Sequence, residues 1–406
     1  MCRFIGFISI DCGLQVNITS YGEKSTGLNY SSDEQFIDTG ERRVISEEYK
    51  DNIQQQYWSL RSFPEGDRNC YKIDVTAGTK YLIRASFFYG NYDGQGMPPV
   101  FDLYLGANSW DSIEPEDSRS NSIEKEIIHV PQKSHVHVCL VKTGHGIPFI
   151  SALEFRPLDN SAYQTESGSR SLALYIRRDT GSRGERARRL WSSTSIWSSP
   201  PHQRDRARSV VALTRVRRVA DQKEISGAKI ESTTATRIMA SEYGKEKDVY
   251  DRFWYDIAYA DWKDISTNLT IDIGGAKDHY KIPSTILSTA VTPKDQNASL
   301  DIWWQETDDN TTLYYFYMHF AEIEQLQANE SREFNILHNG RHFYGPVSPK
   351  YLRRRTVYTL TPFSGSYHNF SISKTGNSTL PPLINAFETY TVKELSQSES
   401  DQQDGK

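Results

Sequence analysis

Apolar and polar residues alternate along most of this chain, and the alternation has a period of two. In the first part, such runs cover residues 71–75, 81–89, 101–105, 123–130, 136–142 and 150–155. In the later part they cover residues 269–273, 314–320, 334–338, 356–360, 370–374 and 384–392. No long segment keeps the 3.6-residue period of an amphipathic helix, and turn residues separate the runs. Short strands at this spacing predict an all-β, antiparallel β-sandwich architecture.

The two parts also repeat each other at a nearly constant offset of 232 to 234 residues. Residues 81–83, 101–103, 142–144 and 150–154 align with residues 314–316, 334–336, 374–376 and 384–388, in the same order. Ordered matches at one offset are typical of a tandem duplication. The sequence therefore predicts two β-domains of about 150 residues each.

The repeat also predicts where the domains begin and end. We expect a first domain over residues 5–160, a connector and first strand of the second domain over 161–182, an insertion over 183–242, the rest of the second domain over 243–393, and a polar acidic tail over 394–406.

The insertion differs sharply in composition from the sequence around it. Arg183 through Arg218 holds ten arginines, no lysine and two acidic residues. An arginine run is typical of an arm that binds nucleic acid or anionic lipid. This one lacks interleaved aromatic residues apart from Trp191 and Trp197, and it interrupts a predicted sheet domain. We therefore expect a solvated, disordered loop, for which translated intron sequence is one origin.

Composition narrows the classes of protein that fit. The chain has 406 residues, 12% of them aromatic, and a formal net charge of −5. This charge argues against nucleic acid as a partner of the whole chain. No apolar run approaches the roughly 18 residues of a membrane helix, and Met1 to Phe7 is too short for a secretory signal peptide.

The number of asparagine glycosylation motifs indicates in which compartment the protein is located. The glycosylation motif Asn-x-Ser/Thr begins at Asn17, Asn29, Asn268, Asn297, Asn310, Asn329, Asn369 and Asn377. Roughly three such motifs are expected by chance, so this number favours a glycosylated, extracellular protein.

The four cysteines leave their pairing open. They are Cys2, Cys12, Cys70 and Cys139, all in the first third of the chain. One disulfide among the last three and a set of buried free thiols are both compatible with the spacing.

Several longer phrases resemble one protein family. They span residues 7–13, 57–64, 68–71, 171–179, 248–254 and 380–388. These phrases are similar to the malectin-like ectodomain of plant leucine-rich-repeat receptor-like kinases, over roughly residues 5–182 and 243–393. The resemblance implies two malectin-like sandwiches packed side by side on the extracellular face of the plasma membrane. It also implies a parent protein whose repeats, membrane helix and kinase follow, so that catalysis and membrane association belong to the parent.

The resemblance also suggests where a ligand binds, because animal malectin holds a disaccharide with aromatic and acidic loop residues. The positions most similar to these are Phe88, Tyr89, Tyr92 and Asp93. Aromatic rings stack on sugar faces, and a carboxylate accepts from hydroxyls. The alternative is that the rings alternate into the core and that residues 92–94 form a turn. The matching stretch of the second copy, residues 320–323, has lost most of its rings.

Each of two further aromatic clusters can be interpreted either as a functional site or as a structural element. Tyr57, Trp58 and Arg61 would suit a glycan or a peptide, or would hold a structural strand. Trp303 and Trp304 are adjacent, so one of them must face away from the core if they lie on a strand.

No catalytic constellation is evident in the sequence. It has no nucleophile elbow and no zinc-binding His-Glu-x-x-His, and its histidines and cysteines do not cluster at ligand spacing. We expect no metal and no cofactor. The sequence predicts a non-catalytic recognition module that binds a cell-wall carbohydrate or a secreted peptide, with a co-receptor as a further partner. A carbohydrate-active enzyme, or its sugar-binding module, is the alternative.

Overall fold

The computed structural model describes residues 6–24, 26–114, 122–166, 170–181, 237–238, 248–257, 259, 261–272, 274, 278–305 and 311–395. Helical structure within these ranges is limited to the short elements η1 (Glu47–Asn52), η2 (Gln55–Tyr57) and α4 (Ser284–Leu287). The predicted all-β class is therefore confirmed. The predicted insertion and the acidic tail lie mostly outside the described residues, except that Arg237–Ile238 form strand β15.

The largest sheet runs through the whole molecule. Its main path, in spatial order, is β2 (Ser20–Gly22), β3 (Asn29–Ser32), β1 (Ile8–Asp11), β13 (Ala152–Pro157), β7 (Tyr81–Phe87), β10 (Ile123–His129), β14 (Arg170–Asp179), β26 (Ala386–Glu394), β20 (Leu313–Phe320) and β23 (Arg355–Tyr358). Off this path, β15 and β14 pair with β16 (Trp254–Asp256), and β20 pairs with β24 (Phe363–Ser364).

Smaller sheets cover each half of this large sheet. The first half carries the order β6 (Arg68–Asp74), β11 (His135–His145), β8 (Val100–Leu105) and β9 (Asn108–Ile113), and the order β12 (Phe149–Ile150), β5 (Ser59–Ser62) and β4 (Glu41–Val44). The second half carries the order β19 (Leu300–Gln305), β25 (Tyr367–Lys374), β21 (Phe334–His338) and β22 (Arg341–Val347), and the pair β17 (Trp262–Ser266) and β18 (Thr289–Pro293).

The two halves share one strand topology. The order β3-β1-β13-β7-β10 in the first half matches β16-β14-β26-β20-β23 in the second, and the pairs β3–β1 and β16–β14 are both parallel. The order β6-β11-β8-β9 likewise matches β19-β25-β21-β22. Two tandem β-sandwiches follow from this correspondence, as the 232–234-residue offset predicts. We call them the first and the second sandwich.

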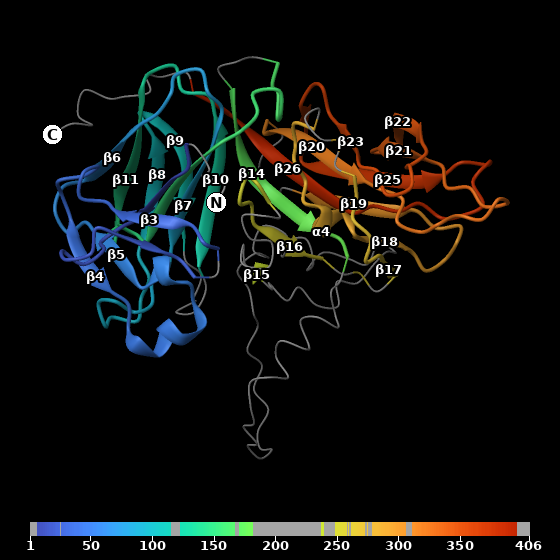
Figure 1. Ribbon diagram of the computed structural model, residues 1–406. Helices are drawn as coiled ribbons and strands as arrows, with labels where there is room; N and C mark the ends of the chain where they lie inside the picture. The colour runs from blue at the N-terminus through green and yellow to red at the C-terminus, as the bar shows by residue number, and fades with distance from the viewer. Residues whose placement is uncertain are drawn as a thin grey trace, which may run out of the picture.

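The two sandwiches are joined edge to edge rather than only packed together. Strand β10 of the first sandwich pairs antiparallel with β14 of the second, so that Ile127 lies opposite Ala173 and Ile128 lies opposite Leu172. Figure 1 shows this junction at the centre of the molecule, between the blue-green and the yellow-red halves. The junction therefore fixes the two sandwiches in one continuous sheet.

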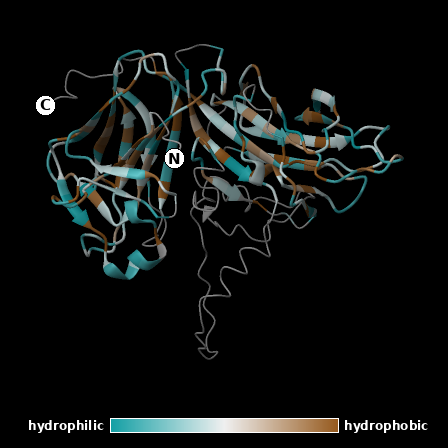
Figure 2. Cartoon of the chain, in the orientation of Figure 1, coloured by the Kyte–Doolittle hydropathy of each residue, from teal (hydrophilic) through white to brown (hydrophobic). Residues whose placement is uncertain are grey.

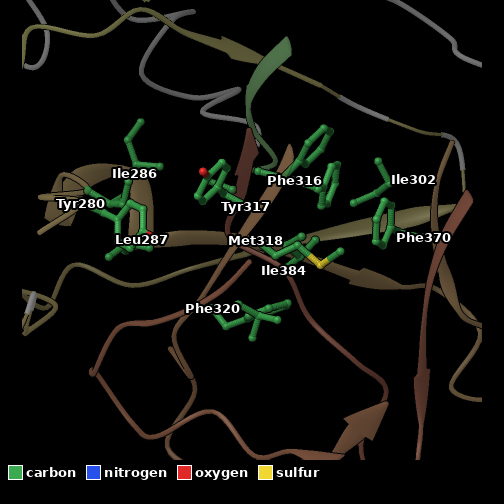
Figure 3. Packing of buried hydrophobic residues seen from close by; sticks show 14 of the residues in the cluster. Tyr280, Ile286, Leu287, Ile302, Phe316, Tyr317, Met318, Phe320, Phe370 and Ile384 are labelled. Carbon is green, nitrogen blue, oxygen red and sulfur yellow. The ribbon is translucent and has the colours of Figure 1, made fainter. Parts of the chain in front are cut away.

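Each sandwich has its own apolar core, built from the inward side of its strands. In Figure 2 the hydrophobic positions follow the strands of both halves. In the second sandwich Phe316 on β20 stacks on Phe370 on β25, with ring centroids 4.2 Å apart, and Ile302 lies beside them (Figure 3). Aromatic stacking across the two sheets closes this core.

One predicted strand is wrong, and several strands were not predicted. The run 269–273 is not a strand over its described residues, which make only an isolated bridge between Asp272 and Arg353. Leu269 is exposed, and the Asp272 carboxylate accepts from the Gly274 N–H in a turn. Strands such as β4 and β22 were missed because they are largely exposed and lack clean alternation.

The cysteine pairing is resolved in the first sandwich. Cys70 and Cys139 lie opposite each other on β6 and β11 and form a disulfide. Cys12 is a buried free thiol, and burial raises its pKa. The structure thus combines both interpretations of the sequence, while Cys2 lies outside the described residues.

Candidate functional site

The candidate loop of the first sandwich follows directly after β7, and most of its rings point inward. Phe88 and Tyr89 are both buried. Phe88 packs edge-to-face on Tyr57, and Tyr89 packs edge-to-face on Tyr92 and donates a hydrogen bond to the Asp93 carboxylate. These contacts join residues from both predicted clusters into one internal aromatic group.

Gly90 shows why the loop passes so close to the neighbouring segment. Its φ is +48°, and a Cβ placed there would lie 2.5 Å from Cγ2 of Ile45. The Ser46 N–H donates to the Gly90 carbonyl at 2.9 Å. A side chain at this position would push the segment that follows β4 away from the loop. At Gly90 the group that comes close to the backbone is therefore Ile45 of the protein itself, and not a ligand.

The second predicted cluster is split between the interior and the surface. Arg61 on β5 is buried in a two-point ion pair with Asp33, with Nε–Oδ2 at 2.6 Å and Nη2–Oδ1 at 2.7 Å. The Tyr57 hydroxyl donates to Glu124 at 2.7 Å. Trp58 follows η2, is 39% exposed, and donates its indole N–H to the Ile53 carbonyl.

Only three of the seven candidate ligand-binding residues reach the surface. They are Trp58, Tyr92 and Asp93, and Tyr92 is partly buried. Backbone bonds from Ile45 to Trp58 and from Ser46 to Gly90 hold their two segments next to each other. We call these three residues the first-sandwich patch. It offers ring surface and one carboxylate.

The matching stretch of the second sandwich has an internal role. Phe320 to Ile323 are all buried, and Glu322 is bound to Arg332 at 2.7 Å. Of the adjacent tryptophans on β19, Trp304 is buried and Trp303 is 43% exposed, as the alternation of a strand requires.

The second sandwich has a groove that the sequence alone did not reveal. It lies between the edge strands β22 and β23 and has a volume of about 380 Å³. Its lining residues are Phe343, Tyr344, Thr356, Val357, Tyr358, Leu360, Thr361 and Phe363. Among them Tyr344, Tyr358 and Leu360 are exposed. The guanidinium of Arg355 lies 5.7 Å from the centre of the Tyr344 ring and donates to its hydroxyl. We call this feature the Leu360 groove.

A buried network of arginines and carboxylates lies on the strands at the junction of the two sandwiches. Arg84 on β7 binds Glu126 on β10 at 2.8 Å and Glu154 on β13 at 2.7 Å. Arg177 on β14 binds the other oxygen of Glu126 at 2.8 Å and Glu388 on β26 at 2.8 Å. Glu126 therefore joins one arginine from each sandwich.

The electrostatics of this network favour a structural role. Burial opposes ionisation of Glu126, but Arg177 and Arg84 hold its pKa below the usual value. Burial likewise opposes ionisation of Glu154, yet Arg156 and Arg84 lower its pKa to about 2. A glycosidase needs one carboxylic acid with a raised pKa beside a carboxylate. Glu126 and Glu154 are shifted in the opposite direction. Asp251, which contacts Arg84 and Arg156 in the same network, is the exception, because burial raises its pKa.

Over the ranges that the structure describes, no group of three or more His, Cys, Asp or Glu residues is arranged to hold a metal ion. Within the same ranges no helix is both long and apolar enough to cross a membrane.

Comparison with known proteins places this architecture in a family. The model of the malectin-like domain matches residues 10–243 and 230–392. The chain belongs to the malectin-like family. Its two sandwiches are thus malectin-like domains in tandem.

The relatives are plant receptor kinases. The chain is 41% identical over 398 residues to a probable LRR receptor-like protein kinase of Arabidopsis thaliana, and 37% identical over 402 residues to the LRR receptor-like serine/threonine-protein kinase IOS1 of the same plant. These alignments cover 97% and 98% of this chain but only 38% of each relative. The chain is therefore homologous to the N-terminal, ectodomain portion of these kinases.

Solved ectodomains have the same fold. That of ANX2 from Arabidopsis thaliana superposes with a TM-score of 0.64 at 14% identity, covering 97% of this chain and 98% of the other. FER in a complex of the plant peptide RALF23 with FER and LLG2 superposes with a TM-score of 0.61 at 14% identity, covering 99% and 98% of the two chains. At this identity the likeness establishes the fold alone.

Proposed function

We propose that this malectin-like chain is the extracellular recognition module of a plant leucine-rich-repeat receptor-like kinase, and that it binds a secreted peptide. The observation that carries the proposal is its homology, over nearly its whole length, to the ectodomain portion of such kinases. A similarly folded ectodomain, FER, is known in complex with the peptide RALF23 and with LLG2. We further propose that a co-receptor takes part in binding.

The accessibility of the glycosylation motifs supports an extracellular location. Within the described ranges six of the seven motif asparagines are exposed, and Asn369 is partly buried. Asn310 lies outside those ranges. An N-linked glycan is bulky, so a folded protein accommodates it only where the asparagine lies on the surface. We propose that the exposed motifs carry glycans and that the receptor parent presents this chain outside the plasma membrane.

A cell-wall carbohydrate is the second candidate ligand, and the first-sandwich patch is the observation that favours it. The exposed ring of Trp58 can stack on a sugar face, and the Asp93 carboxylate can accept from its hydroxyls. The junction network gives no support to hydrolysis of a glycan, because Glu126 and Glu388 are bound to arginines.

A chimeric receptor tests this function. This chain replaces the malectin-like portion of the relative that is 41% identical, in plant cells, with a kinase-inactive chimera as the control. Receptor phosphorylation is measured after addition of extracellular wash fluid, untreated or pretreated with protease or with glycosidase. We expect a response that protease abolishes.

The remaining outcomes separate the alternatives. A response lost only after glycosidase treatment would assign a carbohydrate ligand and would be expected to weaken in Trp58→Ala. The absence of any response would contradict a role in recognition. Release of reducing sugars from cell-wall glycans by the purified chain would identify an enzyme instead.

A further inference from the structure

The internal repeat gives equivalent positions at the outer edges of the two sandwiches. Ile128, at the end of β10, corresponds to Leu360 at the repeat offset of 232 residues. Ile128 is 3% exposed, because β14 pairs alongside it. Leu360 is 76% exposed. The same aliphatic position is therefore covered by a strand in the first sandwich and uncovered in the second.

The strand beside Leu360 is open on its outer side. Among the described strands β23 pairs with β20 alone, and it ends the spatial order of the large sheet. The Thr359 N–H donates to the Phe316 carbonyl of β20 at 3.0 Å. Hydrogen-bonded and non-hydrogen-bonded positions alternate in an antiparallel ladder, so the backbone groups of Tyr358 point away from β20. An added strand would find backbone partners there.

The Leu360 groove beside this edge supplies contacts for side chains. Tyr344 and Tyr358 provide ring surface, and among the residues that the structure describes no acidic side chain lines the groove. An extended segment places alternate side chains on one face, so that one aliphatic residue could lie on Leu360 while its backbone pairs with β23. At the junction Leu172 of β14, a strand of the second sandwich, lies opposite Ile128 of the first in this way.

The positive charges near β23 favour a bound segment that is acidic. Arg355 begins β23, is exposed, and within the described residues has no carboxylate within 4.0 Å. Lys350 and Arg353 are exposed in the segment that leads into β23, where Arg353 forms a backbone bridge with Asp272. Their charges contrast with the net negative charge of the chain as a whole. An acidic segment would gain charge-assisted hydrogen bonds here, and its association would be accelerated by the local field.

Neither protection of the edge nor pairing with a second copy accounts for these features as well. Charged residues and proline, such as Arg355 and Pro362, are devices that protect an edge strand from pairing. A protected edge nevertheless has no reason to expose Leu360 beside two tyrosines. A second copy of this chain, pairing through its own β23, would bring two edges that both carry Arg355 together, without a carboxylate from either β23 to balance the charge.

We propose that the Leu360 groove and the outer edge of β23 bind an extended, acidic segment of a partner protein, which extends the sheet of the second sandwich as β14 extends that of the first. This site deepens the proposed function and rests on it only in that the ligand is a peptide.

Fluorescence anisotropy on the full chain tests the site. The probe is a labelled synthetic heptapeptide in which leucine and glutamate alternate. Two matched probes replace every glutamate with lysine, or alternate leucines with proline, which removes backbone donors. We expect only the acidic probe to bind, and to bind more weakly as salt is raised.

Protein variants locate the binding. Leu360→Asp and Arg355→Glu are each expected to weaken binding of the acidic probe at least roughly tenfold. Trp303→Ala, which removes an exposed ring from β19 at the other edge of the small sheet, is the matched control and should bind as the original protein does. Circular dichroism spectra of the variants confirm that they are folded.

Several outcomes would overturn the site. They are failure of the acidic probe to bind at about 1 mM, equal binding of the lysine or proline probe, and unchanged binding in Leu360→Asp. Dimerisation that Leu360→Asp abolishes, seen by analytical ultracentrifugation, would assign the groove to a second copy. A chimeric receptor that carries Leu360→Asp and still responds to a protease-sensitive ligand would overturn the site and leave the recognition function intact.

Discussion

The two sandwiches have one strand order but are stabilised and covered differently. At one pair of equivalent positions the first sandwich has the Cys70–Cys139 disulfide, whereas the second has Asp301 opposite Ser371, with a hydrogen bond between their side chains. At another pair Ile128 is buried and Leu360 is exposed. The repeated architecture therefore does not require either feature. The two sandwiches differ in the contact that links the first pair of positions and in the burial of the side chain at the second.

The difference at the edges has a structural cause. In the first sandwich the equivalent edge strand is β10. It is covered at the junction, because β14 pairs with it and Arg177 of β14 forms an ion pair with Glu126. The second sandwich has no strand on its equivalent edge among the described residues. The junction therefore covers β10 but leaves the equivalent strand β23 at an end of the large sheet, where an added strand can bind without disturbing the fold.

The largest expected effect comes from breaking the junction. Arg177→Met leaves carboxylate oxygens of Glu126 and Glu388 buried without their cation, and such a loss costs about 3–5 kcal/mol. Urea denaturation followed by tryptophan fluorescence measures the free energy of unfolding. Arg170→Ala is the control on the same strand, because its pairs with Glu166 and Glu394 are partly exposed and are worth about 0–1 kcal/mol. Equal effects of the two substitutions would contradict a stabilising role for the network.

A matched truncation sharpens the comparison of the edges. Ile128→Ala is expected to lower the free energy of unfolding by about 2–5 kcal/mol, because it leaves a cavity beneath β14. Leu360→Ala is expected to change it by no more than about 0.5 kcal/mol, because the side chain is exposed. Thermal or urea unfolding of both variants checks this. A large loss in Leu360→Ala would show that the exposed leucine stabilises the fold.

Of the three changes expected to destabilise the fold, removal of the disulfide has the smallest expected effect. Replacing both Cys70 and Cys139 with alanine is expected to cost about 2–4 kcal/mol, since the bridge constrains the unfolded chain over a sequence separation of 69 residues. Hydrogen exchange by mass spectrometry should show faster exchange in β6 and β11 and no change in β19 and β25. Equal acceleration in both sandwiches would mean that the two unfold as one unit.

Much of the strand content could be predicted from local alternation, but the candidate site could not. The run 334–338 coincides with β21, because each residue of that strand alternates between the core and the outer face. Arg61 looked available for a ligand because its partner Asp33 lies 28 residues away in sequence. Nothing in the sequence distinguishes Leu360, which is exposed, from its repeat partner Ile128, which is buried. Both cases depend on contacts between segments that are distant in sequence.

The sequence by itself determined the all-β class, the duplication and the membership of the malectin-like family, because period-2 alternation, a constant offset and long ordered phrases are local properties of the chain. Tertiary structure alone decided which cysteines pair, which aromatic residues reach solvent, and which sandwich edge is covered. These depend on which strands become neighbours, both within each sandwich and across the junction. Strand pairing between distant segments is set by the global packing of two apolar cores rather than by any one stretch of residues.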